Sequence, residues 1–139
     1  MTQEEKQLLL QELCVRLPYG VKCQIKEFGE NFFTLKSINI DYKNGHLLTF
    51  EEKINGLPVE VYLSEAKPCL ISVDSMTSDE FDDFFINESV MLDVYDIMDV
   101  LMDDIDVINK LNKRHFDYRG LIPMGLAIDA TNLGIYENK

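Results

Sequence analysis

Hydrophobic and polar residues follow two different periods on either side of Gly20. Before it, leucines recur at helical intervals in a polar segment, and Thr2 stands three residues before Glu5, the spacing of a capping box. Pro18 follows, and proline biases the residue before it away from helical geometry. Because glycine tolerates positive φ, we expect a helix over residues 3–17 that ends in a turn.

After this turn the period changes to two, which is typical of half-buried strands. The apolar residues change parity between Leu35 and Ile38, and this change predicts a β-bulge at residues 36–37. Asparagine and glycine accept the left-handed conformations of tight β-turns. The Lys-Asn-Gly sequence at 43–45 and the Asn-Gly sequence at 55–56 therefore predict two hairpins.

The alternation continues through Val59, Val61 and Leu63. A last apolar run follows Lys67 and Pro68, and because proline lacks a ladder donor, we expect an edge or final strand there. The connections between these strands are too short for parallel crossovers. The sequence thus predicts an antiparallel β-meander of four to five strands.

The pattern becomes helical again in the last part of the chain. One helix is expected from Ser78, and a longer one from Val90 carries apolar residues on one face and aspartates on the other. Basic residues at 110–114 suit a helix C-terminus, where the partial charge is negative. We expect a single α+β domain over residues 1–139, with an N-terminal helix and C-terminal acidic helices packed on the sheet.

Charge is distributed unevenly along the chain. It holds 25 acidic and 13 basic residues, for a net charge of −12. Twelve of the acids lie within residues 74–106, where there is no lysine, arginine or histidine, so the remainder is balanced at 13 against 13. Binding a phosphate backbone requires lysine or arginine to release counterions. Direct contact with nucleic acid or with an anionic membrane is therefore disfavoured.

Cysteine usage and hydropathy indicate a cytoplasmic protein without a membrane span. The three cysteines, Cys14, Cys23 and Cys69, form no CxxC pair, and we expect reduced core thiols. No apolar run approaches the ~20 residues that cross a bilayer. Walker loops, GxSxG elbows, HExxH and dinucleotide glycine patterns are absent from the sequence. The sequence therefore names no catalytic residue, metal ligand or cofactor, and it leaves enzymatic activity open.

Four aspartates recur every three to four residues along the expected long helix: Asp93, Asp96, Asp99 and Asp103. Their spacing, roughly 4.5 to 6 Å, is comparable to that of phosphates along a nucleic-acid strand. This favours a DNA-mimicking surface that binds a basic protein, such as a nucleic-acid-binding host protein. Charge runs more often form a solvated face that only keeps a protein soluble. Methionines on the opposite face suit either a core or a subunit contact, which leaves a homodimer open.

A second candidate site consists of His115, Asp117, Tyr118 and Arg119. A histidine near a carboxylate can transfer protons, and an arginine can hold a phosphate or carboxylate with its two-pronged donor array. In this alternative the chain is a small-ligand or nucleotide-binding protein that uses Arg119 and His115. In the structural interpretation, Asp117 and Arg119 instead tie a turn together while the aromatic residues pack. Residues that are adjacent in sequence more often have such a structural role than converge on a ligand.

Two stretches carry a resemblance to known sequences. They are Lys67-Pro68-Cys69-Leu70 leading to Asp74-Ser75-Met76-Thr77, and His115-Phe116-Asp117-Tyr118-Arg119-Gly120-Leu121-Ile122. Both resemble a family of short uncharacterised proteins from gut-bacterial genomes and their prophages, although an aromatic is usual there in place of Cys69 and a second histidine in place of Arg114. The resemblance implies a phage or mobile-element setting and supplies no catalytic residues. Together with the acidic helix face, the resemblance leads us to expect a small acidic accessory protein of unassigned activity, a non-enzymatic protein-binding module of the inhibitor or DNA-mimic kind.

Overall fold

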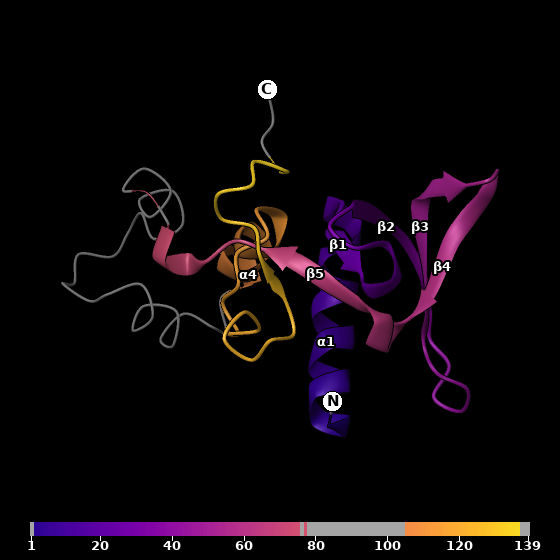
Figure 1. Cartoon of the computed structure of the whole chain (residues 1–139). Coiled ribbons are helices and arrows are strands. Elements are labelled where there is room, and N and C mark those ends of the chain that lie inside the picture. The colour runs from indigo at the N-terminus through magenta and orange to yellow at the C-terminus, as the bar shows by residue number, and fades with distance from the viewer. Residues whose placement is uncertain (1, 76, 78–104, 137–139) are drawn as a thin grey trace.

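The computed structural model describes residues 2–75, 77 and 105–136 (Figure 1). The helices expected from Ser78 and Val90 lie outside these residues. So do all four aspartates of the DNA-mimic prediction, Asp93, Asp96, Asp99 and Asp103. The described chain combines an N-terminal helix with a mixed sheet of six strands, which is an α+β arrangement. No helix in the described residues is both long and apolar enough to cross a membrane.

Helix α1 (Gln3–Arg16) begins at the predicted capping box. The Glu5 N–H donates to Thr2 Oγ1 at 3.1 Å, and the Thr2 N–H donates to Glu5 Oε1 at 2.8 Å. These bonds satisfy donors that a helix N-terminus leaves unpaired. The helix ends in a 3₁₀ turn, η1 (Leu17–Tyr19), and Gly20 has a φ of 68°. The predicted helix and turn are confirmed.

The six strands form one sheet in the order β4-β3-β2-β1-β5-β6. Strands β1 to β4 pair antiparallel in sequence order, β5 pairs antiparallel with β1, and β6 pairs parallel with β5. The predicted antiparallel meander of four to five strands is therefore wrong, because β5 returns to β1 and a C-terminal strand adds a parallel pair. The strand bounds are β1 (Lys22–Ile25), β2 (Phe32–Asn39), β3 (Leu47–Ile54), β4 (Leu57–Tyr62), β5 (Ala66–Leu70) and β6 (Ile128–Asp129).

The sheet curls because β4 and β5 are close in sequence but distant in strand order. Four strand spacings separate them, which is about 19 Å in a flat sheet. The chain from Tyr62 to Ala66 spans at most roughly 14 Å, and the 3₁₀ turn η3 (Leu63–Glu65) shortens it further. The sheet must therefore bend until the end of β4 meets the start of β5, as Figure 1 shows.

The local features predicted for the strands are confirmed. Asn55 and Gly56, with φ of 55° and 81°, form the left-handed turn between β3 and β4. A longer loop around residues 43–45 joins β2 to β3. The register of β2 against β3 shifts between Leu35 and Ser37, which is the predicted bulge. Each of these features depends only on residues that are neighbours along the chain.

Strand β5 lies inside the sheet, so the prediction of an edge or final strand at Pro68 is wrong. Cys23 of β1 pairs with Pro68 on one side. On the other side β6 pairs only with Cys69 and Leu70, so β5 has a single neighbour at the proline. The proline thus avoids the two-sided pairing that its missing N–H donor disfavours.

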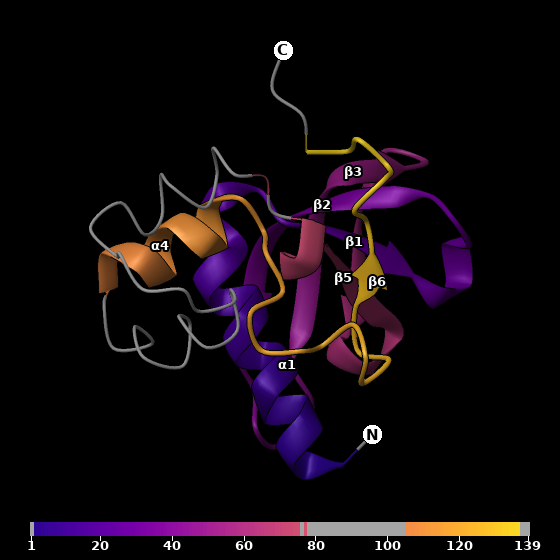
Figure 2. The same ribbon diagram turned by 90° about the vertical axis from the view of Figure 1, so that its left-hand side faces the viewer.

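Helix α1 lies between helix α4 (Ile105–Lys113) and strands β2 and β3, as both views show (Figures 1 and 2). Leu9 and Leu13 are fully buried in the core that the helix shares with the strands. The other side of α1 faces α4 and the segment after it, and there Glu12 and Arg16 are also fully buried. Polar contacts as well as apolar packing therefore hold the C-terminal residues against α1.

Candidate functional site

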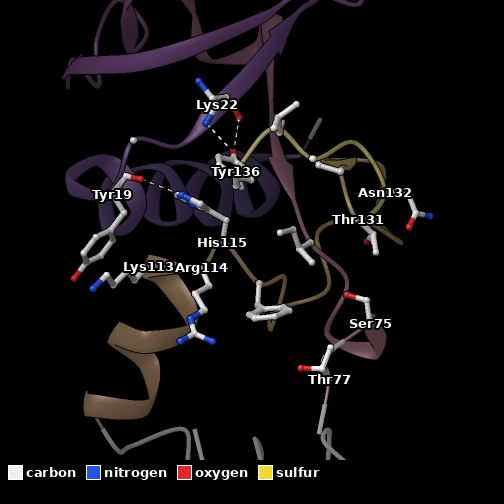
Figure 3. Close-up of a pocket in the computed structure, with 16 residues that line it drawn as sticks. Tyr19, Lys22, Ser75, Thr77, Lys113, Arg114, His115, Thr131, Asn132 and Tyr136 are labelled. Carbon is white, nitrogen blue, oxygen red and sulfur yellow. Dashed lines mark hydrogen bonds between the residues drawn. The ribbon is translucent and has the colours of Figure 1, made fainter. Parts of the chain in front are cut away.

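A groove of about 1020 Å³ lies where four segments of the chain meet (Figure 3). The segments are the turn at residues 19–22, residues 71–75 and Thr77 after β5, residues 113–116 at the end of α4, and the C-terminal residues 130–136. We call it the C-terminal groove. Because its walls come from distant parts of the sequence, only the folded chain forms it.

His115 occupies the position that ends α4. Its N–H donates to Asn112 O at 3.1 Å, and the Phe116 N–H donates to Leu111 O at 3.0 Å, which together make a Schellman motif. This motif requires a left-handed residue, usually glycine, and His115 has a φ of 61°. Histidine tolerates this geometry, but glycine would adopt it without strain. The contacts of the imidazole, rather than the needs of the turn, therefore account for a histidine here.

The imidazole of His115 is buried at the base of the C-terminal groove. Its Nε2 lies 3.0 Å from the Tyr19 carbonyl oxygen, and its ring stacks on Tyr136 with a centroid distance of 4.0 Å. Burial, followed by the charge of Arg16, lowers the pKa of His115 from 6.5 to about 4, so the ring is neutral at physiological pH. Since a carbonyl oxygen only accepts, Nε2 carries the proton. The other nitrogen, Nδ1, is then a buried acceptor without a partner among the described residues.

Tyr136 fills the gap where β1 and β5 separate. Its hydroxyl accepts from the Lys22 N–H at 2.8 Å and lies 2.7 Å from Cys69 O. Cys23 and Pro68 form the last pair between β1 and β5, so the Tyr136 hydroxyl takes the place of the next backbone hydrogen bond between these two strands. Burial raises the pKa of Tyr136, and the hydroxyl therefore keeps its proton and donates it to the carbonyl.

The charged side chains that line the C-terminal groove are cationic. Lys113 and Arg114, at the end of α4, are among its lining residues (Figure 3). Lys22 also lines it, but its ammonium donates to Thr34 Oγ1 at 2.9 Å. A helix C-terminus carries only about half a negative charge, which is less than the charge of Lys113 alone. No aspartate or glutamate occurs among its described lining residues.

Of the four residues of the predicted ligand site, only the histidine lines the C-terminal groove. The Asp117 carboxylate accepts the N–H groups of Leu121 and Ile122 at 2.8 and 2.9 Å, and so fixes the turn that follows. The Tyr118 hydroxyl donates to Asn112 Oδ1 at 2.8 Å. Both side chains therefore serve local structure in the described chain, as the structural interpretation expects.

Arg119 lies away from the C-terminal groove, against α1. Its Nε is 3.0 Å from Glu12 Oε1 without hydrogen-bond geometry, whereas Glu12 Oε2 accepts two bonds from Arg16 at 3.1 and 3.0 Å. The two guanidinium groups lie 5.5 and 5.6 Å from the centroid of the Tyr118 ring. The guanidinium predicted to hold an anion is thus already paired with a fully buried carboxylate.

Sequence reasoning missed three residues or pairs that define this region: Tyr136, Lys113 as part of a groove, and the buried Glu12–Arg16 pair. The spacing of four residues between Glu12 and Arg16 favours a helical ion pair, and this spacing could have revealed them. Their burial depends on the segment after α4, which no local pattern locates. Tyr136 follows no periodic signal at all.

The buried thiols supply no nucleophile. Burial raises the pKa of Cys23 above its ordinary value and that of Cys69 to about 12, so both remain protonated near neutral pH. Within the described parts of the chain, no group of three or more histidine, cysteine, aspartate or glutamate side chains could hold a metal ion. The side chains that line the C-terminal groove offer cations, several hydroxyl groups, an amide and a stacked aromatic pair.

Comparisons with protein-family models, with curated proteins and with solved structures found no match for this chain. Function must therefore be argued from the geometry and charge of the C-terminal groove, together with the charge pattern of the sequence.

Proposed function

We propose that this protein binds a small anionic ligand, one that carries a phosphate or carboxylate group, in the C-terminal groove. The observation that carries the proposal is the sign of the lining charges: Lys113 and Arg114 line it, and none of its described lining residues is acidic. The chain has a net charge of −12, so the charged residues that line the C-terminal groove are opposite in sign to the chain as a whole. Its volume of about 1020 Å³ is at the upper end of small-molecule sites.

The polar residues around the two cations suit the oxygens of such a ligand. Tyr19, Ser75 and Thr131 bring hydroxyl groups to the C-terminal groove, and Asn132 brings an amide. Hydroxyl and amide groups both donate and accept, so they can orient a ligand whose charge is held elsewhere. The proposal keeps His115 from the alternative predicted by the sequence. Arg119 is paired with Glu12 and lies outside the C-terminal groove, so the proposal places the cationic contacts at Lys113 and Arg114 instead.

Binding rather than covalent catalysis fits the described residues. His115 has a pKa of about 4 because burial disfavours its charged form, which makes it a weak base at neutral pH. The thiols of Cys23 and Cys69 are buried and protonated. A groove with charge-assisted donors but without an activated nucleophile is suited to holding a ligand.

Calorimetric titration with inorganic pyrophosphate and with a nucleoside monophosphate at low ionic strength tests this proposal. Replacing both cations, Lys113→Gln and Arg114→Gln, should weaken binding at least about tenfold, because charge-assisted hydrogen bonds to oxygens are lost. The matched control, Lys43→Gln with Lys53→Gln, removes the same charge from exposed positions outside the C-terminal groove. Equal binding by both double variants, or no binding by the natural chain, would contradict the proposal.

A second candidate function is favoured by the twelve acidic residues within residues 74–106. In this reading the chain is a non-enzymatic accessory protein or inhibitor that binds a basic, nucleic-acid-binding protein through aspartates such as Asp96 and Asp99. Such an interface is held by long-range charge attraction, so it should weaken steeply as salt rises.

A pull-down from host lysate at low and high salt tests this second candidate. The variant Asp96→Asn with Asp99→Asn should lose the partner, whereas Glu4→Gln with Glu30→Gln, which removes two acids elsewhere on the chain, should keep it. Added double-stranded DNA should release a partner that is held by mimicry. A partner retained in the presence of DNA would rule mimicry out.

A further inference from the structure

One wall of the C-terminal groove is a strap formed by residues 130–136, which supplies six of its lining residues. The strap is anchored firmly at its start, where β6 pairs with β5 and the Ala130 N–H donates to Leu70 O at 2.8 Å. The Ser72 N–H also donates to Thr131 Oγ1 at 3.0 Å. Further along, the backbone bond of Leu133 is to Ala130, within the strap itself. The start of the strap is therefore tied to the sheet by several backbone bonds.

Among the described residues, the hydrogen bonds that hold the far end of the strap come from the side chain of Tyr136. Its hydroxyl reaches the backbone of Lys22 and Cys69, and its ring lies on His115 at an interplanar angle of 26° (Figure 3). The hydroxyl is the partner of the Lys22 N–H, which therefore reports directly on whether the strap is closed. Gly134 has a φ of 65° and lies just before this contact.

We propose that the strap opens and closes over the C-terminal groove, with β6 as its hinge and Tyr136 as its latch. Release of the latch leaves the β5–β6 pairing intact, because the two anchors share no hydrogen bond. It withdraws the Tyr136 ring from His115 and opens the wall of the C-terminal groove that residues 130–136 form, so that a ligand can enter before the strap closes again. The proposal that the strap controls ligand entry rests on the proposed anion-binding function. The proposal that Tyr136 holds the strap closed is independent of that function.

Hydrogen exchange of the Lys22 amide, measured by NMR on the whole chain, tests the latch. Tyr136→Phe keeps the ring and removes the hydroxyl, so exchange at Lys22 should accelerate by about tenfold or more, because the amide loses its only partner at this site. The ladder amides of β2 and β3 should be unchanged. Tyr62→Phe, at a half-exposed position on β4, is the matched control. Unchanged exchange at Lys22, or acceleration across the whole sheet together, would overturn the latch.

Saturating inorganic pyrophosphate supplies the second arm of the test. Binding beneath a closed strap should slow exchange of the amides at residues 131–136 at least several-fold in the natural chain, and less in Tyr136→Phe. Pyrophosphate that binds without slowing these amides would overturn the role of the strap in access. A chain whose Lys22 amide responds to Tyr136→Phe but which binds no pyrophosphate keeps the latch and overturns the anion-binding proposal instead.

Discussion

His115 joins three separate constraints at a single residue. Its backbone ends α4 in left-handed geometry, its Nε2–H donates to the turn after α1, and its ring supports Tyr136. Burial depresses its pKa because a charged imidazole would lose its hydration. The residue therefore links helix, turn and strap at a place where its neutral form is favoured.

Stability should consequently fall as acid protonates His115. The unfolded chain takes up this proton near pH 6.5 and the folded chain only near pH 4, so the unfolded state binds more protons between these values. The stability that the neutral form of His115 contributes is fully present above pH 6.5 and is lost as pH falls through this window. The loss in the free energy of unfolding is on the order of 3 kcal/mol. Urea unfolding of the natural chain and of His115→Asn at several pH values should show a smaller acid loss in the variant. Parallel curves would contradict this assignment.

At the scale of elements, α1 is buried on two sides rather than one. An amphipathic helix normally turns its polar side to water, but the Glu12 and Arg16 side of α1 is covered by the residues after α4, and Arg16 Nη2 donates to Phe116 O. Buried ion pairs gain little net stability over apolar groups, yet removing one partner leaves an uncompensated charge. The Glu12–Arg16 pair therefore fixes how the residues after α4 pack on α1.

Glu12→Gln should destabilise the fold strongly because it leaves Arg16 buried beside a neutral amide. We expect a loss of about 3–5 kcal/mol in the free energy of unfolding, measured by urea denaturation. Glu60→Gln, at an exposed position on β4, should change the same quantity by no more than about 0.5 kcal/mol. A loss below about 1 kcal/mol in Glu12→Gln would show that the pair does not hold the docking.

At the scale of the whole molecule, the net charge of −12 opposes compaction. The charge is concentrated in one quarter of the sequence, so the repelling groups are close together along the chain. Salt screens such repulsion, since the Debye length falls from about 10 Å at 0.1 M to about 3 Å at 1 M.

Sodium chloride should therefore raise the melting temperature, by about 3–6 °C between 0.1 and 1 M, which corresponds to roughly 1 kcal/mol for a chain of this size. Scanning calorimetry measures this directly. The variant Asp96→Asn with Asp99→Asn carries less charge and should respond less to salt. A melting temperature that falls with added salt would mean that attractive pairs, rather than the repulsion, dominate the electrostatics.

The sequence alone determined the features that depend on residues close together along the chain. The capping box at Thr2, the bulge after Leu35 and the turn at Asn55 were all predicted and are all present, because each follows from a local period or from the backbone freedom of one or two residues. The presence of a sheet beside an N-terminal helix followed in the same way.

Only the tertiary structure decided which strands are neighbours and which side chains meet. Strand β5 pairs with β1 rather than with β4, so the short connection between β4 and β5 requires the sheet to curl, and a two-residue strand near the C-terminus becomes the parallel partner of β5. The same long-range pairing brings Tyr136 to His115 and Arg119 to Glu12. These contacts join residues more than twenty positions apart, and their energies come from burial and from bonds that no periodic pattern encodes.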